Sequence, residues 1–372
     1  MYIPTFNITH RLVEYLIKLE LSARSIKDIP LPSNEKLKIL NDSESEALFQ
    51  ISKLAEVPVS LRKAKDIASQ GHDILNENPA ERLLSNYRSC WDFMFSSTNE
   101  KYVSLSPSLL LHLNKLLFDG VVESWEIGRF RSVKDDINKK YDSFFDVRNK
   151  EYDTYDFEKE FYEILNWYSS SQYKIHPAIK TAVVLYEILQ SYPFLSGNMI
   201  TAISVGELLF ERTYLSLKHL FALPRTFVNY KDELKEALSV SIKQNGDQTR
   251  WIEEFVRGLA LDMTELKNEI LQVEQEKVGK KKKKFLGLNT RQLRLMKWLQ
   301  KKEKIYRRDY VKRMGVSTMT AYRDLNELLK RKLILLKGGG RSTYYTVYKD
   351  TEPIGDSNFK KSKVVKVIND LE

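Results

Sequence analysis

Apolar side chains recur at helical spacing along most of the first 270 residues of the chain. One such stripe runs from Pro79 to Phe95, and others cover residues 106–117 and 154–170. A residue every third or fourth position on one face is the pattern of an amphipathic helix, and leucine and aromatic stripes of this kind predict a buried core rather than a ligand site. A capped helix is also expected before Pro30, and a shorter one from Ser43 to Glu56.

Two apolar helical patterns meet at residues 191–200, the sequence SYPFLSGNMI. The first pattern runs from Pro177 and the second begins at Thr201. A Pro-Phe and a Gly-Asn pair between helices predict a tight loop at the start of the second helix. The unpaired N–H groups and the positive dipole end of that helix would suit a phosphate.

A different pattern occupies residues 288–348. Two helical stripes, a Gly-Val-Ser turn and a third helix are followed by two β-rich runs around Gly338–Gly340. Helix, helix, turn, helix and hairpin in this order predict a winged helix. The third helix resembles the recognition helix of bacterial winged-helix repressors, whose N-terminal half enters the major groove. The residues expected to contact DNA are Ser317, Thr318, Thr320, Tyr322, Arg323 and, at the tip of the wing, Arg341.

Charge separates the two halves of the chain. The net charge of the chain is +10, yet Lys277 to Tyr348 hold 22 Lys and Arg against 4 Asp and Glu, so this segment carries +18 and the remainder −8. A basic segment beside an acidic body favours nucleic acid as the partner of the winged helix over a second protein. The five lysines from Lys280 to Lys284 predict an extended linker over residues 274–287, either a DNA contact or a solvated hinge.

The cysteine, the histidines and the apolar runs of the sequence narrow the expected location and chemistry of the protein. A single cysteine, Cys90, excludes an intramolecular disulfide and fits a reducing, cytoplasmic location. The five histidines show no metal-ligand spacing. No apolar run approaches the ~20 residues that a membrane span needs, and no signal peptide is expected.

The loop at 191–200 resembles the signature of the Fic (Fido) family, His-x-Phe-x-Asp/Glu-Gly-Asn-Gly-Arg-x-x-Arg. Pro193, Phe194, Gly197 and Asn198 fit the signature. Its other positions are changed: Tyr192 stands for the catalytic histidine, Ser196 for the acidic Mg²⁺ ligand, Met199 for the second glycine, and Ile200 and Ile203 for the two arginines. The resemblance implies nucleotide binding by Gly197 and Asn198, with ATP and Mg²⁺ as cofactors only if the site still functions.

Further matches lie outside the loop. Arg129, Phe130 and Arg131 resemble the start of the family's flap, a β-hairpin that holds a target strand, although a structural loop explains them equally well. Ser52 and Glu56 resemble the family's inhibitory helix, although an ordinary solvated glutamate explains Glu56 too. His176-Pro177 resembles a family feature and is interpreted as structural.

The expected fold is mainly α, a Fic-type helical bundle with a small β-hairpin flap and a C-terminal winged helix. The expected divisions are an N-terminal helical region at 1–100, a Fic-like core at 101–273, the linker, the winged helix at 288–348 and a tail at 349–372. The favoured function is a DNA-binding regulator with an inactive Fic body, and a homodimer is left open. Two alternatives stay open: an active protein AMP-transferase, because the loop retains Gly197 and Asn198, and a scaffold that binds a protein partner through the flap.

Overall fold

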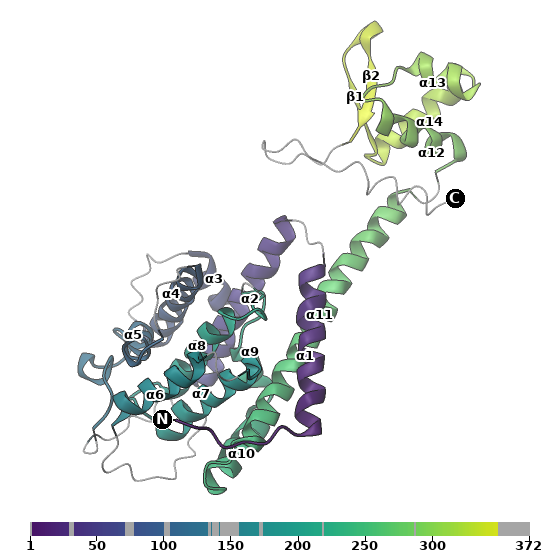
Figure 1. Cartoon of the computed structure of the whole chain (residues 1–372). Coiled ribbons are helices and arrows are strands. Elements are labelled where there is room, and N and C mark those ends of the chain that lie inside the picture. The colour runs from purple at the N-terminus through teal and green to yellow at the C-terminus, as the bar shows by residue number, and fades with distance from the viewer. Residues whose placement is uncertain are drawn as a thin grey trace. The chain divides into compact units, whose positions relative to one another are not determined.

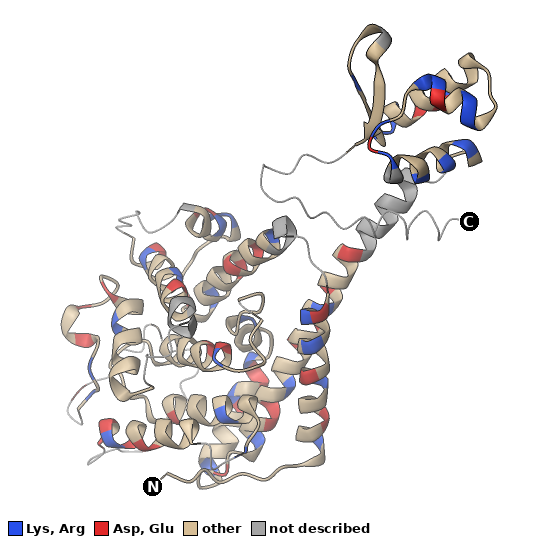
Figure 2. Ribbon diagram, turned by 45° about the horizontal axis from the view of Figure 1, so that its top comes forward, with Lys and Arg blue, Asp and Glu red and all other residues tan. Residues whose placement is uncertain are grey.

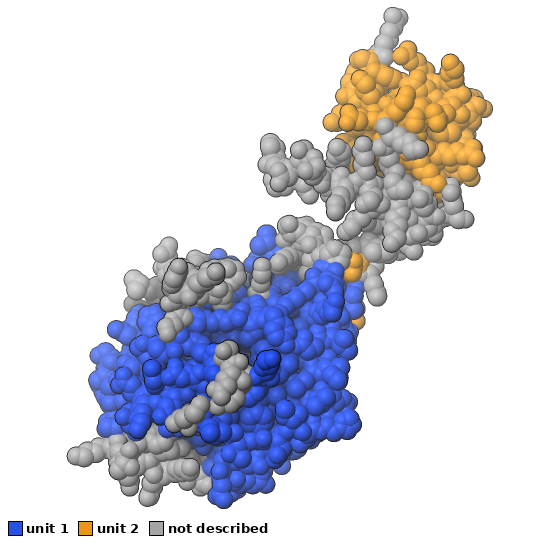
Figure 3. Space-filling model, in the orientation of Figure 1, with its two compact units in different colours: residues 1–271 blue, residues 272–372 orange. Residues whose placement is uncertain are grey.

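The computed structural model describes residues 2–29, 33–70, 78–99, 105–132, 135, 141, 156–170, 174–217, 219–285 and 288–348. The chain forms two compact units, Met1–Leu271 and Gln272–Glu372, coloured separately in Figure 3. The described residues are mainly helical, which confirms the predicted fold class. No helix in them is long and apolar enough to cross a membrane.

The secondary-structure elements of unit 1, within its described residues, are all helices (Figure 1). Its elements are α1 (His10–Asp28), α2 (Ser33–Leu54), α3 (Leu61–Gln70), α4 (Pro79–Asn99), α5 (Pro107–Phe118), the short 3-10 helix η1 (Ser124–Glu126), α6 (Phe157–Ser169), α7 (Pro177–Ser191), α8 (Asn198–Glu211), α9 (Pro224–Asn229), α10 (Lys231–Lys243) and α11 (Thr249–Phe285).

Local sequence sets several helix starts. Thr9 caps α1, because its hydroxyl accepts a hydrogen bond from the N–H of Leu12. His176 caps α7 in the same way for Ala178, and Pro177 occupies the first turn, where its missing N–H costs nothing. His176 also lies 2.9 Å from Glu20 of α1, so its contacts are those of a structural residue.

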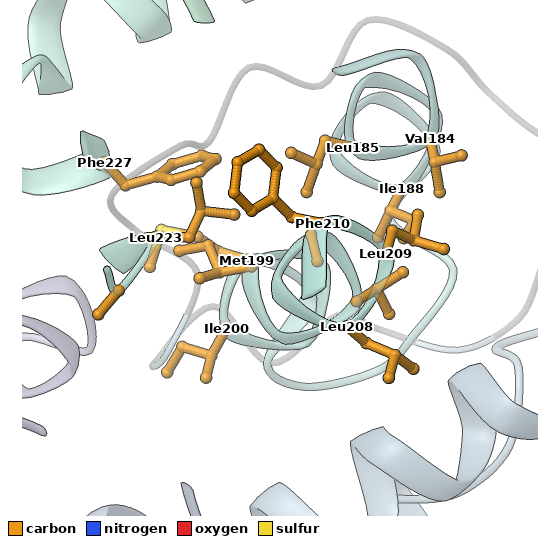
Figure 4. Packing of buried hydrophobic residues seen from close by; sticks show 14 of the residues in the cluster. Val184, Leu185, Ile188, Met199, Ile200, Leu208, Leu209, Phe210, Leu223 and Phe227 are labelled. Atoms are coloured by element: carbon orange, nitrogen blue, oxygen red, sulfur yellow. The ribbon is translucent and has the colours of Figure 1, made fainter. Parts of the chain in front are cut away.

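The centre of unit 1 is the pair α7 and α8. Every residue of α8 except its last, Glu211, is buried, and so are most of α7. Figure 4 shows Leu185 and Ile188 of α7 beside Leu209 and Phe210 of α8, all within one apolar cluster. A helix that is apolar on all sides belongs inside a bundle, so the loop between α7 and α8 is held at the core.

Three expectations need correction. The helix expected from Ser43 to Glu56 begins earlier, at Ser33, and ends at Leu54. The lysine run is not an extended linker, because α11 continues through it to Phe285. Within the expected flap hairpin, residues 127–132 form no strand; the remainder, apart from Asp135 and Tyr141, lies outside the described residues.

Unit 2 contains the predicted winged helix. Its elements are α12 (Thr290–Lys301), α13 (Arg307–Met314), α14 (Thr318–Lys330), β1 (Ile334–Lys337), the 3-10 helix η4 (Gly340–Ser342) and β2 (Tyr344–Val347). The strands pair antiparallel, with Ile334 opposite Val347, and Ile305 bridges to Tyr345. The tail at 349–372 lies outside the described residues.

A buried carboxylate joins the three helices of unit 2. Asp324 of α14 accepts hydrogen bonds from Asn289 and Arg291 at the start of α12 and from the Tyr310 hydroxyl of α13, each at 2.9 Å. Burial opposes ionisation of Asp324, but these donors outweigh it and hold its pKa below the ordinary value. These hydrogen bonds fix the orientation of α14 relative to α12 and α13.

Candidate functional site

The loop between α7 and α8 is buried from Ser191 to Asn198. Tyr192 ends α7 in the left-handed conformation, with φ of 49° and ψ of 63°, and is only 2% exposed. A non-glycine residue in this region is uncommon and persists only where its surroundings hold it. The side chain at the position of the catalytic base is therefore packed inside the bundle.

Arg131 holds this loop from the flap side. Its backbone N–H donates to the carbonyl of Pro193 at 2.8 Å, and its guanidinium donates to the carbonyls of Tyr192 at 2.6 Å and Ser191 at 3.2 Å. The guanidinium also lies over the ring of Phe157, 5.1 Å from its centre. Arg131 thus satisfies carbonyls at the end of α7, a structural role.

The other two flap residues are anchored as well. The ring of Phe130 stacks on Phe194 of the loop and on Phe161 of α6, with centroids 5.8 and 5.9 Å apart. Arg129 pairs with Asp135 at 2.8 Å, and this hydrogen bond lowers the pKa of Asp135 to about 2. All three residues 129–131 therefore contact other parts of unit 1.

Ser196, at the position of the metal-binding acid, contacts an acid from elsewhere in the chain. Its hydroxyl donates to Glu126 at 2.6 Å, and both side chains are buried. Asn114 of α5 completes the contact, because its amide N–H donates to the Ser196 carbonyl at 3.0 Å and its oxygen accepts from the N–H of Gly128. Sequence reasoning missed Glu126 and Asn114, since neither stands at a recognisable spacing from the loop.

Gly197 and Asn198 close the loop tightly. Asn198 accepts a hydrogen bond from the N–H of Phe194 at 2.8 Å and donates to its carbonyl at 3.0 Å. Gly197 has φ of +73°, and a Cβ added there would lie 2.0 Å from the ring of Phe118 at the end of α5. The ring of Phe118 therefore occupies the space beside the glycine.

Apolar side chains fill the positions of the family's second glycine and its arginines. Met199, Ile200 and Ile203 are all fully buried in α8, and Figure 4 shows the first two among the core side chains. An arginine pairs readily with phosphate, whereas these side chains offer no charge or hydrogen bond. This stretch of α8 belongs to the core.

The two residues of the inhibitory-helix pattern, Ser52 and Glu56, have different surroundings. Ser52 is buried in α2 and donates to the carbonyl of Phe49 at 2.7 Å. Glu56 is exposed beyond the end of α2, in a left-handed conformation with φ of 54°. The arginine that Glu56 would pair with in the family is Ile203 here.

Two other carboxyl groups are buried in unit 1. Burial raises the pKa of Glu187 of α7 to about 7 and that of Glu207 of α8 to about 8. Glu187 accepts hydrogen bonds from the hydroxyl of Tyr2 and the amide of Gln248, and Glu207 accepts from the hydroxyl of Tyr87. Each carboxyl therefore joins separate segments of the chain.

Within the described residues, no three His, Cys, Asp or Glu side chains form a group that could hold a metal ion.

The outward face of α14 is the second candidate site. Leu325 and Leu328 face the core, as helical spacing predicts, and Leu329, expected on the same face, is partly buried against it. Ala321 is buried as well. Met319 is 61% exposed and Tyr322 is 48% exposed, and Thr318 and Arg323 are exposed beside them. The helical repeat places Met319, Tyr322, Arg323 and the half-buried Asn326 on one face. Sequence reasoning looked for polar residues in the N-terminal half of the helix. It therefore missed Met319, which is apolar, and Asn326, which lies in the C-terminal half.

Ser317 and Thr320 interact with each other at the start of α14. The Ser317 hydroxyl accepts from the Thr320 N–H at 3.1 Å and lies 2.9 Å from the Thr320 hydroxyl. Their first role is therefore to cap α14. Arg341 belongs to η4, and its side chain lies outside the described residues.

One cation contacts this face, others lie on α12 and α13, and two of them rest on aromatic rings. The guanidinium of Arg307 lies 5.5 Å from the ring centre of Tyr322, and that of Arg313 lies 4.6 Å from Trp298. An open cleft lies at α12 and α13, lined by Trp298, Lys302, Glu303, Lys304, Tyr306, Asp309, Lys312 and Arg313. Figure 2 shows the basic residues along these helices. Such cations can contact phosphates while the face of α14 contacts bases.

Comparison with known proteins matches two family models to separate parts of the chain. Residues 104–210 match the model of the Fic/DOC family, and residues 291–346 match that of the DeoR-like helix-turn-helix domain. No curated protein sequence matches the chain.

Solved structures are similar in fold. A Fic family protein from Desulfovibrio desulfuricans G20 is 15% identical with a TM-score of 0.56, and the alignment covers 95% of this chain and 100% of that one. Residues 134–508 of Fic-1 from C. elegans are 15% identical with a TM-score of 0.55, covering 72% and 73% of the two chains. At these identities the likeness concerns the fold alone.

Proposed function

Because the chain carries a Fic/DOC family domain and a DeoR-like helix-turn-helix domain, we propose that it is a DNA-binding transcriptional regulator whose Fic body does not transfer AMP. The observation that carries the first part is the outward face of α14. Thr318, Tyr322 and Arg323 stand exposed on a helix whose opposite face is packed into the domain. A recognition helix needs this arrangement to reach base edges in the major groove.

Charge supports DNA as the ligand of this face. Residues 288–348 hold 16 Lys and Arg against 4 Asp and Glu, a net charge of +12. Contacts to phosphates supply most of the affinity of a DNA-binding domain, and contacts to bases supply its specificity. The cations of α12 and α13 fit the first role, and Arg323 fits the second because a guanidinium can pair with guanine through two hydrogen bonds.

The packing around the interhelical loop supports the absence of AMP transfer. Transfer to a protein hydroxyl needs a general base with a pKa near neutrality, and a free tyrosine ionises only near pH ~10. Tyr192 is also buried in the core, and the ring of Phe118 fills the space beside Gly197. ATP would meet two isoleucines where the family presents arginines, so little charge would balance its phosphates.

DNA binding is tested with the full-length protein. Selection from a random duplex library should yield a preferred sequence, and fluorescence anisotropy should then show binding that weakens steeply with salt. Arg323→Ala should reduce discrimination at one base pair by about 1–3 kcal/mol. Arg62→Ala, which removes an exposed arginine from α3 of unit 1, is the charge-matched control. A protein that binds no DNA at low salt would exclude the regulator function.

Catalysis is tested separately. Incubation of the full-length protein with labelled ATP and Mg²⁺, alone and with a cell extract, should leave no label on any protein. Calorimetry with ATP and Mg²⁺ should give no heat. Transfer that depends on Mg²⁺ and is lost in a Tyr192→Phe variant would establish an active enzyme and overturn this half of the proposal.

A further inference from the structure

The solvent face of α1 carries an apolar stripe. Val13, Ile17 and Leu21 are 40%, 55% and 61% exposed, and they follow one another at intervals of four residues. Residues at this interval lie one above the other on a helix, so the three form a continuous strip. The opposite face of α1 packs against the rest of unit 1 through Leu12, Leu19, Ala23 and Ile26. The strip is thus additional to the contacts that hold α1 in place.

Most charges beside the buried face of α1 are paired within the chain. Arg11 contacts Glu254 of α11 at 2.8 Å, Lys27 donates to the carbonyl of Tyr214, and Glu20 contacts His176. Tyr214 is itself 61% exposed, and its hydroxyl donates to Glu20 at 2.5 Å, so its ring extends the apolar surface on this side. The borders of the strip are therefore fixed by contacts with α11 and with the segment after α8.

The charges on the strip favour a second copy of the same helix in the antiparallel direction. With a two-fold axis midway between Ile17 and Leu21, Ile17 faces the partner's Leu21 and Glu14 faces the partner's Arg24. In the same register His10 faces the partner's Asp28, which also lies 4.0 Å from the exposed Arg24 of its own helix. A parallel arrangement would instead bring Glu14 to Glu14 and Arg24 to Arg24, which is repulsive.

We propose that α1 forms the contact of a homodimer, in which the strips of two copies pack antiparallel around Ile17 and Leu21. A two-fold contact of this kind is self-complementary, so every favourable pair occurs twice. Exposed apolar strips bordered by charge are a common feature of protein interfaces. This proposal concerns unit 1 and does not depend on DNA binding or on catalysis.

The oligomeric state of the full-length protein is the first test. Light scattering after gel filtration, over a dilution series, should give the mass of a dimer for the wild type. Ile17→Glu should give a monomer, because the charge would be buried at the centre of the contact. Tyr162→Glu is the matched control, since Tyr162 is an equally exposed apolar residue on α6, and this variant should remain a dimer. Circular dichroism should show all variants folded, because both sites are exposed.

Charge reversal tests the antiparallel register. Glu14→Arg and Arg24→Glu should each raise the dimer dissociation constant by about tenfold or more, because two-fold symmetry repeats each substitution. The double variant should return the constant close to that of the wild type. Two single variants that weaken the dimer without mutual rescue would overturn the register.

Three results would overturn the contact itself. The first is a wild type that is monomeric throughout the dilution series. The second is a dimer that Ile17→Glu leaves intact. The third is a monomeric wild type whose α1 is protected from hydrogen exchange, with the protection lost in Ile17→Glu. The last result would mean that another segment of the same chain covers the strip.

Discussion

At the scale of the residue, Gly197 lies against the ring of Phe118 in the loop between α7 and α8. Gly197 matches the family pattern, and a glycine in such a loop usually leaves room for a ligand. In this chain the room is taken by Phe118, whose ring lies where a Cβ would be. The same residue type therefore serves core packing, because the ring is supplied by α5, about eighty positions earlier in the sequence.

Gly197→Ala tests this packing. The new Cβ must sit in the left-handed region and must also displace the Phe118 ring. We expect a loss of about 2–5 kcal/mol in the free energy of unfolding, from backbone strain of ~1–2 and overpacking of ~1–3 kcal/mol. Urea unfolding of the full-length protein measures it.

Gly246→Ala supplies the control for backbone strain. Gly246 has φ of +83° and nothing within 4 Å of an added Cβ, so only the strain is incurred. This variant should lose about 1–2 kcal/mol. Equal losses for the two variants would show that the Phe118 ring does not crowd Gly197.

Glu187→Gln tests the pH dependence of stability. The carboxyl ionises near pH 4.5 in the unfolded chain, but burial raises its pKa to about 7 in the folded protein. Between these values the folded state keeps a proton that the unfolded state has released, so rising pH favours unfolding. The stability contributed by the protonated Glu187 is complete below pH 4.5 and is lost as pH rises through about 7.

Glutamine cannot release a proton, and it can retain the hydrogen bonds from Tyr2 and Gln248. The variant should therefore lose roughly 2–3 kcal/mol less stability than the wild type between about pH 5 and about pH 8. Urea unfolding at the two pH values measures the difference. Glu207 titrates with the same sign in both proteins, so its effect cancels in the comparison. Parallel pH profiles would contradict the prediction.

At the scale of the element, helices were predicted well wherever their signals were local. The capped helix expected before Pro30 is α1, with Thr9 as its cap, and the apolar pattern that runs from Pro177 is α7. The start of α2 at Ser33 was missed, because α2 packs against α3, α4 and α9, and this packing cannot be read from the local sequence.

The outward face of α14 leads to a prediction about bases. Met319 and Tyr322 are apolar on a surface that is otherwise polar, and apolar side chains contact the methyl group of thymine in the major groove. In the preferred DNA sequence, replacing one thymine by deoxyuridine should therefore weaken binding of the wild type. Met319→Ala should discriminate less than the wild type between the two duplexes, as fluorescence anisotropy can show.

Leu336→Ala is the control, because Leu336 is an exposed apolar residue on β1, outside α14. It should retain the discrimination between thymine and deoxyuridine. A wild type that binds DNA sequence-specifically but ignores every thymine methyl would contradict this prediction and leave the proposed function intact.

At the scale of the whole molecule, α11 is the element that crosses the boundary between the units. It begins at Thr249 within unit 1 and ends at Phe285, beyond the boundary at Leu271. The five lysines were expected to extend the chain by mutual repulsion, and the structure places them in this helix instead. Lysine has a high helix propensity, which offsets part of that repulsion.

Replacing Lys280 to Lys284 by glutamine tests whether this part of α11 contacts DNA. If it does, affinity for non-specific duplex should fall and the slope of log K against log salt should become shallower by up to about 4.5, since each phosphate contact contributes ~0.9. Glutamine at Lys231, Lys235 and Lys243 of α10 is the control and should leave the slope unchanged. An unchanged slope in the first variant would make the lysine run a solvated part of the helix.

The sequence by itself determined the mainly helical fold, the winged helix and the place of the interhelical loop. These depend on spacing, caps and turn residues, which act between neighbours in the chain. It also determined the concentration of positive charge in the C-terminal part.

Only the tertiary structure decided what surrounds the loop. Phe118, Glu126, Asn114 and Arg131 come from segments distant in sequence, and packing brings them to Gly197, Ser196 and Tyr192. Likewise, helical spacing could not distinguish the exposed strip of α1 from its buried face, because both are apolar. Which face remains in solvent depends on where the rest of the chain packs, and that is a property of the folded molecule.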